Sequence, residues 1–168
     1  MPYDPASTLW AKTSEHFFRQ QTFRPFKQAG PHCVSTSLAI LSGAAPESFQ
    51  GKINTQDPRT WSDALRSYGM KLAFCPTDVR KLTFYVEELL RLDDLFTLSY
   101  YTPQTPEDVL ADPDQSGLVC GSHVVVLHRD TVLNPATGAS SALHGFEGAE
   151  FHTKRIFRVV PLAHERGL

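Results

Sequence analysis

Hydrophobic residues in the first half of the chain recur at helical spacing. Val34, Leu38 and Leu41 fall at positions i, i+4 and i+7, and the residues between them are small or apolar. This pattern predicts a largely buried helix. Gly43 follows, and glycine readily adopts the left-handed conformation that ends many helices. Pro31 suits the first turn of this helix, because no backbone N–H is needed there.

Three other segments are predicted to be helical. Thr8–Gln21 carries apolar residues that can be buried on one face, and Asp78–Leu92 carries a stripe of Val and Leu. Between them, Thr60 and Asp63 have the spacing of a capping box, in which side chains bond the free N–H groups of a first turn. Gly69 is expected to end the helix that begins there.

Residues rich in β-branched and aromatic side chains predict the strands. Most of them follow the helices, which favours an antiparallel meander packed on helices, the α+β class. The proline-rich, acidic segment 102–117 is expected to be a surface loop inserted in a single domain that covers residues 1–168. If it covered a substrate groove, it would favour a basic peptide. The predicted strands are Met70–Cys75, Leu95–Tyr101, Ser122–Arg129, Thr131–Asn134 and Arg155–Pro161.

Composition limits the protein class. The 168 residues are 41% hydrophobic and 20% charged, as in folded globular proteins. The net charge of −2 argues against binding to nucleic acid or anionic lipid by charge alone. No apolar run approaches the roughly 20 residues of a membrane span, and the N-terminal residues lack a signal-peptide pattern. A cytoplasmic protein is expected, and secretion as an effector without a cleavable signal stays open.

Common cofactor and metal motifs do not occur in the sequence. It contains no CxxC, HExxH, Walker or GxGxxG pattern, so no cofactor and no metal are expected. Three cysteines are too few for a disulfide framework, and reduced thiols are expected. Cys75 and Cys120 are interpreted as packing residues.

Cys33 stands at the expected start of the buried helix. Unpaired backbone N–H groups and the positive end of the helix dipole lie there, and they can lower the pKa of a thiol from about 8.5 to roughly 3.5–7.5. The same N–H groups can hold an oxyanion. Cys33 is therefore the candidate nucleophile, and a small buried side chain is the alternative interpretation.

His123 is the candidate base. It opens an apolar strand, and alternation places it on one face with Val125 and Leu127, and places His128 on the other face. Asn134 ends the next strand, eleven residues later, so a hairpin would bring it beside His123. Its amide oxygen could orient the imidazole toward Cys33. Asn-Pro also simply begins many turns, and this alternative stays open.

These residues, in this order, resemble the papain-like cysteine peptidases. The similarity is greatest to their small bacterial branch, which includes the double-glycine leader peptidases, and it extends from about Phe26 to Gly138. The branch has a Gln, a Cys that opens a helix, Gly-His before a hydrophobic strand, and Asp-Pro with a later Gly. The corresponding residues here are Gln28, Cys33 with Val34–Leu41, Ser122-His123 with Val124–Leu127, and Asn134-Pro135 with Gly138.

The resemblance implies a papain-like fold with the nucleophile on a buried helix. It implies a catalytic triad of Cys33, His123 and Asn134, and an oxyanion hole made by Gln28 and the Cys33 backbone N–H. Gln20, Gln21 and His32 are alternative oxyanion donors. The chain departs from the pattern at Val34, where the family usually has Gly.

The implied activity is cleavage of a peptide or isopeptide bond through an acyl-enzyme on Cys33, with a peptide or protein as the substrate. Two alternatives stay open. One is transfer of the acyl group to an amine or thiol, as in transglutaminase-like and phytochelatin-synthase-like relatives. The other is a non-catalytic papain-like binding module.

Overall fold

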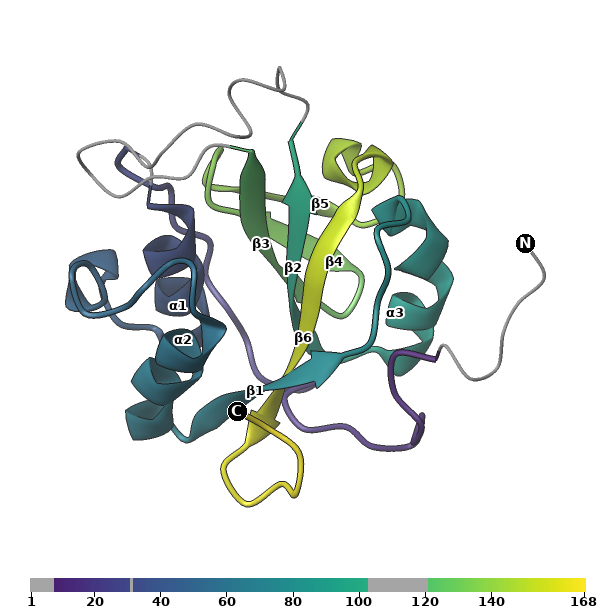
Figure 1. Cartoon of the computed structure of the whole chain (residues 1–168), viewed down its shortest axis with the longest axis horizontal. Helices are drawn as coiled ribbons and strands as arrows, with labels where there is room; N and C mark the ends of the chain where they lie inside the picture. The colour runs from purple at the N-terminus through teal and green to yellow at the C-terminus, as the bar shows by residue number, and fades with distance from the viewer. Residues whose placement is uncertain (1–7, 31, 103–120) are drawn as a thin grey trace.

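The computed structural model describes residues 8–30, 32–102 and 121–168 (Figure 1). In these residues an antiparallel sheet has the strand order β1-β6-β2-β3-β4-β5. Helices α1 (Cys33–Ser42) and α2 (Pro58–Leu65) lie on one side of it, and α3 (Val86–Leu92) lies on the other. The strands are β1 (Met70–Cys75), β2 (Leu95–Tyr101), β3 (Ser122–His128), β4 (Thr131–Asn134), β5 (Ala139–Ala142) and β6 (Thr153–Pro161).

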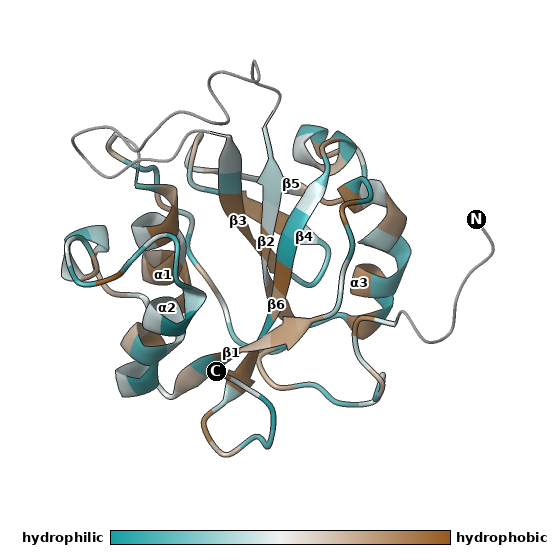
Figure 2. Cartoon of the chain, in the orientation of Figure 1, coloured by the Kyte–Doolittle hydropathy of each residue, from teal (hydrophilic) through white to brown (hydrophobic). Residues whose placement is uncertain are grey.

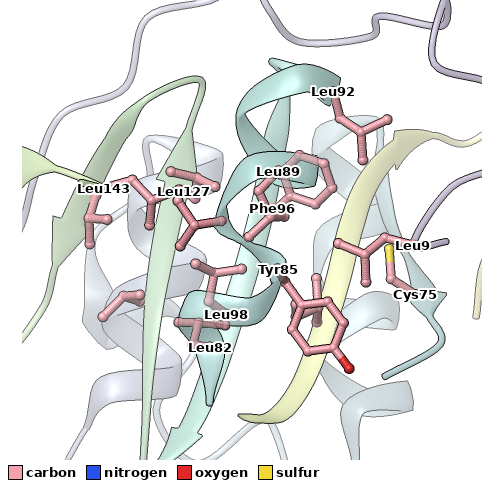
Figure 3. Close-up of a cluster of buried hydrophobic side chains, with 14 of the residues drawn as sticks. Leu9, Cys75, Leu82, Tyr85, Leu89, Leu92, Phe96, Leu98, Leu127 and Leu143 are labelled. Atoms are coloured by element: carbon pink, nitrogen blue, oxygen red, sulfur yellow. The ribbon is translucent and has the colours of Figure 1, made fainter. Parts of the chain in front are cut away.

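The α+β class predicted from the sequence is confirmed, and the sheet separates two hydrophobic clusters. Alternate residues of β3 belong to different clusters: Val124 and Val126 pack toward α1, and Val125 and Leu127 pack toward α3. Figure 2 shows the apolar residues concentrated on the central strands and on the helix faces turned toward them. In Figure 3, Leu89 of α3 lies over Phe96 of β2.

Helix α1 confirms the prediction from apolar spacing. It begins at Cys33 and ends before Gly43, which has a φ of 77° and donates its N–H to the Ala39 carbonyl at 2.8 Å. Every residue from Val34 to Leu41 is buried. This burial fixes the first residue of the helix, Cys33, against the end of the sheet. Pro31 lies outside the described residues.

The predicted N-cap of α2, Thr60, is wrong by three residues. Asp57 caps the helix, because its carboxylate accepts the Arg59 N–H at 3.1 Å, and Pro58 occupies the first helical position. Thr60 lies inside the helix and donates its hydroxyl to the Asp57 carbonyl at 2.7 Å. The helix then tightens into a 3₁₀ turn that ends before Gly69, as expected.

The predicted helix over Asp78–Leu92 is too long. A 3₁₀ turn at Leu82–Tyr85 precedes α3, and Lys81 forms an isolated β-bridge with His152. That bridge holds the backbone extended where a helix was expected. Val79, predicted to face inward, is 66% exposed.

The predicted helix Thr8–Gln21 does not form. This segment runs over the sheet in turns and extended backbone, and distant side chains bind its free N–H groups. Glu88 accepts the Leu9 N–H at 2.7 Å, and the Asp94 carboxylate accepts those of Phe17 and Phe18 at 2.7 and 2.8 Å. These long-range partners replace the hydrogen bonds that a helix would have made.

Three strand assignments also change. β3 ends at His128, one residue before the predicted end at Arg129. β5 was not predicted, because its Ala and Ser residues are exposed and have no apolar alternation. β6 begins at Thr153, two residues before the predicted start at Arg155. The predicted surface loop 102–117 and Cys120 lie outside the described residues, apart from Thr102, so the single-domain prediction with that insertion stays a prediction.

Candidate active site

Cys33 is half-buried at the N-terminus of α1, where the helix meets the start of β3. Burial raises the pKa of its thiol, and a hydrogen bond from the Val124 backbone opposes this effect. The position of Cys33 at a helix N-terminus predicted a lowered pKa, and that prediction is wrong in its direction. Loss of solvation at this depth outweighs the N–H groups of the helix terminus.

A pocket of about 370 Å³ opens beside Cys33. It extends between α1, the segment before α2, and the ends of β2, β3 and β6. Trp61, Lys154 and Arg155 are among its lining residues, whereas His123 and Asn134 do not line it.

His123 and Asn134 are in direct contact across the β3–β4 hairpin. The His123 Nε2 atom lies 2.8 Å from the Asn134 Oδ1 atom. The backbone N–H of Ala136 donates to the same Oδ1 at 3.0 Å. An atom that accepts from a backbone N–H must be the amide oxygen, so Nε2 of the neutral imidazole carries the hydrogen. Nδ1 is then the ring nitrogen with a free lone pair.

The Tyr100 ring packs against the His123 ring of the His123–Asn134 pair. It lies opposite His123 in the β2–β3 ladder, and the two rings meet edge to face with centroids 5.7 Å apart. Phe151 stacks on the Tyr100 ring at 5.6 Å. Burial lowers the pKa of His123, and the hydrogen bond to Asn134 partly opposes this. Burial also raises the pKa of Tyr100 to about 12, with a smaller contribution from a charged Cys33.

The structure brings Cys33 next to the start of β3 through Val124, the residue after His123. Among the hydrogen bonds of the described residues, none joins the Cys33 sulfur to the His123 ring. The raised thiol pKa and the lowered imidazole pKa agree with a neutral thiol and a neutral base in this state.

Gln28, the predicted side-chain oxyanion donor, lies beside the turn that follows Asn134. Its backbone N–H donates to the Pro135 carbonyl at 2.8 Å. Its side-chain Nε2 donates to the Gly30 carbonyl at 2.9 Å, and its Oε1 is buried without a partner in the described part of the chain. Gln28 does not line the pocket at Cys33.

Several neighbours of the site were not predicted. The Val124 N–H, the Tyr100 ring, and the cations Lys154 and Arg155 all lie near Cys33 or His123. The apolar pattern of β2 and β3 indicates that the two strands pair, so some residue of β2 must lie opposite His123. That this residue is Tyr100 depends on the register of the pairing, which cannot be predicted from the sequence. Cys75 is fully buried, which agrees with its interpretation as a packing residue.

The described residues show neither a metal-binding cluster nor a membrane-spanning helix. In residues 8–30, 32–102 and 121–168, no three His, Cys, Asp or Glu side chains gather where they could hold a metal ion. No helix in the same residues is long and apolar enough to cross a membrane.

No family model and no curated protein matches this sequence. Among solved structures, the chain superposes on a double glycine motif protease from AMS/PCAT transporter, crystallised in complex with the leader peptide. The TM-score is 0.50 and the sequence identity 13%, over 83% of this chain and 90% of that one. The two chains are similar in fold. At this identity the similarity supports the papain-like architecture implied by the sequence, and it shows no more than the fold.

Proposed function

We propose that the protein is a thiol hydrolase that cleaves a peptide or isopeptide bond. The observation that carries this proposal is the His123–Asn134 hydrogen bond, which fixes Nε2 as the donor and leaves Nδ1 as a base. Cys33 is held close to the same end of β3, at the N-terminus of a buried helix. The fold shared with a solved protease that binds a peptide makes a peptide the preferred substrate class.

In the proposed first step the Cys33 sulfur attacks the carbonyl carbon of the bond to be cleaved. His123 Nδ1 takes the thiol proton and gives it to the departing amine nitrogen, so the C–N bond breaks and a thioester forms. Water then attacks the thioester, His123 accepts one of its protons, and the thiol is regenerated with release of the acid. Asn134 orients the ring and stabilises the imidazolium through Nε2–H.

The charge that develops on the carbonyl oxygen needs hydrogen-bond donors. The backbone N–H of Cys33 is free of an intrahelical partner, because it belongs to the first turn of α1. Gln28 is the proposed second donor, since its Nε2 carries another hydrogen besides the one bonded to Gly30. Lys154 acts on the nucleophile instead of the carbonyl oxygen. Its positive charge lowers the pKa of Cys33 and so favours the thiolate form.

The proposal is tested by incubating the protein with a diverse library of synthetic peptides and identifying the products by mass spectrometry. The wild-type protein is expected to release new termini, and Cys33→Ala is expected to release none. Cys75→Ala is the matched control, because it removes a buried thiol from the core and leaves the site intact. Cleavage by Cys33→Ala at the wild-type rate would refute the proposal.

Product analysis also separates the two other activity classes. With an added amine such as glycine ethyl ester, a hydrolase releases mainly the free acid, and an acyltransferase releases mainly the amide. If no peptide is cleaved and Cys33 reacts with iodoacetamide no faster than an exposed control thiol, the chain is a binding module.

A further inference from the structure

A β-bulge in β6 changes the direction of two side chains at the candidate site. Ser99 of β2 pairs with Arg155, and the next residue, Tyr100, pairs with Thr153. Lys154 is therefore an extra residue on β6, without an opposite partner on β2. In a regular strand two successive side chains point to opposite faces, but a bulge can place both on one side. Lys154 and Arg155 accordingly both line the pocket at Cys33.

Neither cation is neutralised by a described carboxylate. The Lys154 ammonium donates to the Ser122 hydroxyl at 3.2 Å and lies 5.8 Å from the centre of the Tyr101 ring. The Arg155 guanidinium lies 5.9 Å from the centre of the Trp61 ring. No ion pair in the described ranges includes either residue. Both side chains are only half-exposed.

Positive charge consequently predominates in this part of the pocket. The described residues that line it include no Asp and no Glu, and Ser122 and Asn54 are among the uncharged polar ones. Burial lowers the pKa of Arg155, and Asp57, a carboxylate outside the lining, opposes this effect without forming an ion pair with it. Burial lowers the pKa of Lys154, and the adjacent Arg155 lowers it further. Two half-buried cations that repel each other bind an anion favourably, because the anion relieves the repulsion and replaces lost hydration.

We propose that Lys154 and Arg155 form a carboxylate-binding subsite beside Cys33, so that the preferred substrate carries an acidic group close to the bond that is cleaved. This inference rests on the proposed hydrolase function for the identity of the substrate, but the binding of an anion next to the sulfur does not depend on it. The charge is opposite to what the acidic segment 102–117 suggested, which was a basic peptide.

The subsite can be tested with two alkylating reagents of nearly the same shape. Iodoacetate carries a carboxylate and iodoacetamide is neutral, and both transfer their carbon to the Cys33 sulfur with loss of iodide. The ratio of their rate constants at Cys33 reports the binding of negative charge and cancels changes in thiol reactivity. We expect the double variant Lys154→Met/Arg155→Gln to lower this ratio at least about fivefold at low ionic strength.

A double variant of exposed cations outside the pocket is the matched control. Lys52→Met/Arg59→Gln also removes two positive charges from the molecule. It is expected to leave the ratio of the two rate constants unchanged. An equal loss in both double variants would mean that only net charge matters and would overturn the proposal. An unchanged ratio in Lys154→Met/Arg155→Gln would overturn it as well. So would failure of both reagents to alkylate Cys33, because the pocket that binds the anion must admit them.

Cleaved peptides from the library identify the source of the carboxylate. If it is a side chain, replacing the substrate's Glu or Asp by Gln or Asn lowers kcat/KM in the wild-type protein and not in the double variant. If it is the C-terminal carboxylate, amidation of the peptide has that effect instead. A protein that prefers iodoacetate but cleaves no peptide retains the subsite and loses the hydrolase function. Cleavage without any preference for acidic peptides would support the hydrolase function and overturn the carboxylate subsite.

Discussion

The side chain of Asn134 shows how one residue can serve a turn and a candidate catalytic site together. Its Oδ1 accepts the Ala136 N–H and the His123 Nε2–H, and its carbonyl accepts the Gly138 N–H at 2.8 Å. The sequence offered two competing interpretations of Asn134, a turn residue and an orienting residue. The structure is consistent with both interpretations, because the turn holds the Asn134 Oδ1 atom within hydrogen-bond distance of the His123 Nε2 atom.

Substitution of Asn134 tests whether this contact matters for activity. Asn134→Ala leaves the imidazole without its acceptor, and we expect kcat/KM to fall by about 10- to 100-fold, less than the loss of the base itself. Asn134→Asp keeps an oxygen that accepts both N–H groups and should retain most activity. Circular dichroism controls for folding. If Ala and Asp at this position have the same effect, the oxygen is not the functional atom.

Acid–base behaviour at the site follows from burial. His123 must be unprotonated to accept a proton, and its pKa is lowered from 6.5, so the acid limb of kcat/KM should have its midpoint below pH 6.5. The pKa of Cys33 is raised from 9.0, so its alkylation by iodoacetamide should keep accelerating above pH 9.0. A rate that is already constant between about pH 5 and 8 would contradict this, because it would indicate an ion-paired thiolate with a pKa of about 3–4.

For single residues, the positions of the candidate site residues were predicted better from the sequence than their burial and their neighbours. Cys33 lies at the predicted start of its helix, and His123 and Asn134 meet as the hairpin predicted. The thiol pKa was mispredicted because burial is set by the packing of α1 on the sheet. Lys154 was missed because its direction depends on a bulge, which depends on pairing between β2 and β6.

Among the elements, those with a strong internal pattern were predicted well. α1 and the central strands bury a continuous apolar surface, and the period of that surface is visible in the sequence. The N-terminal segment and β5 depend on partners elsewhere in the chain. Leu9, Phe17 and Phe18 donate their N–H groups to carboxylates more than 70 positions away, and no local pattern can show that.

The turn between β4 and β5 supports the candidate oxyanion donor, and glycine is needed there. Gly138 has a φ of +69°, and a β-carbon on it would lie 2.7 Å from the Lys27 Cβ. Gly138→Ala should therefore lower the free energy of unfolding by about 1–3 kcal/mol. It should also lower kcat/KM, because Lys27 precedes Gln28.

Gly145→Ala is the matched control for this turn. Gly145 also has a positive φ, 83°, but a β-carbon there meets nothing within 4 Å. Both variants share the backbone strain, and only Gly138→Ala displaces Lys27. Equal effects of the two variants on unfolding and on kcat/KM would show that the contact with Lys27 has no role.

At the scale of the whole molecule, a buried ion pair connects the N-terminal segment to two strands of the sheet. Asp94 and Arg158 are fully buried with a 2.8 Å contact, and Arg158 also donates to the Glu15 carbonyl at 2.6 Å. The Asp94 carboxylate accepts the N–H groups of Phe17 and Phe18 as well. The pair therefore attaches the N-terminal segment to the start of β2 and to β6.

Removing the charge of Asp94 should destabilise the whole fold. Asp94→Asn leaves Arg158 buried without its counter-ion, and we expect the free energy of unfolding to fall by about 3–5 kcal/mol in urea titrations. Asp63→Asn is the control, because that carboxylate is 71% exposed and its ion pair with Arg66 is on the surface. A loss no greater than that of the control would show that the buried pair does not hold the segment.

The proposed hydrolysis requires a covalent intermediate at Cys33. The most direct measurement is rapid acid quenching of the protein during turnover of a peptide from the library, followed by mass spectrometry of the intact chain and of its tryptic peptides. We predict an added acyl mass on the peptide that contains Cys33, present in the wild-type protein and absent in His123→Ala. An acyl group on another residue, or full turnover in Cys33→Ala, would contradict the account.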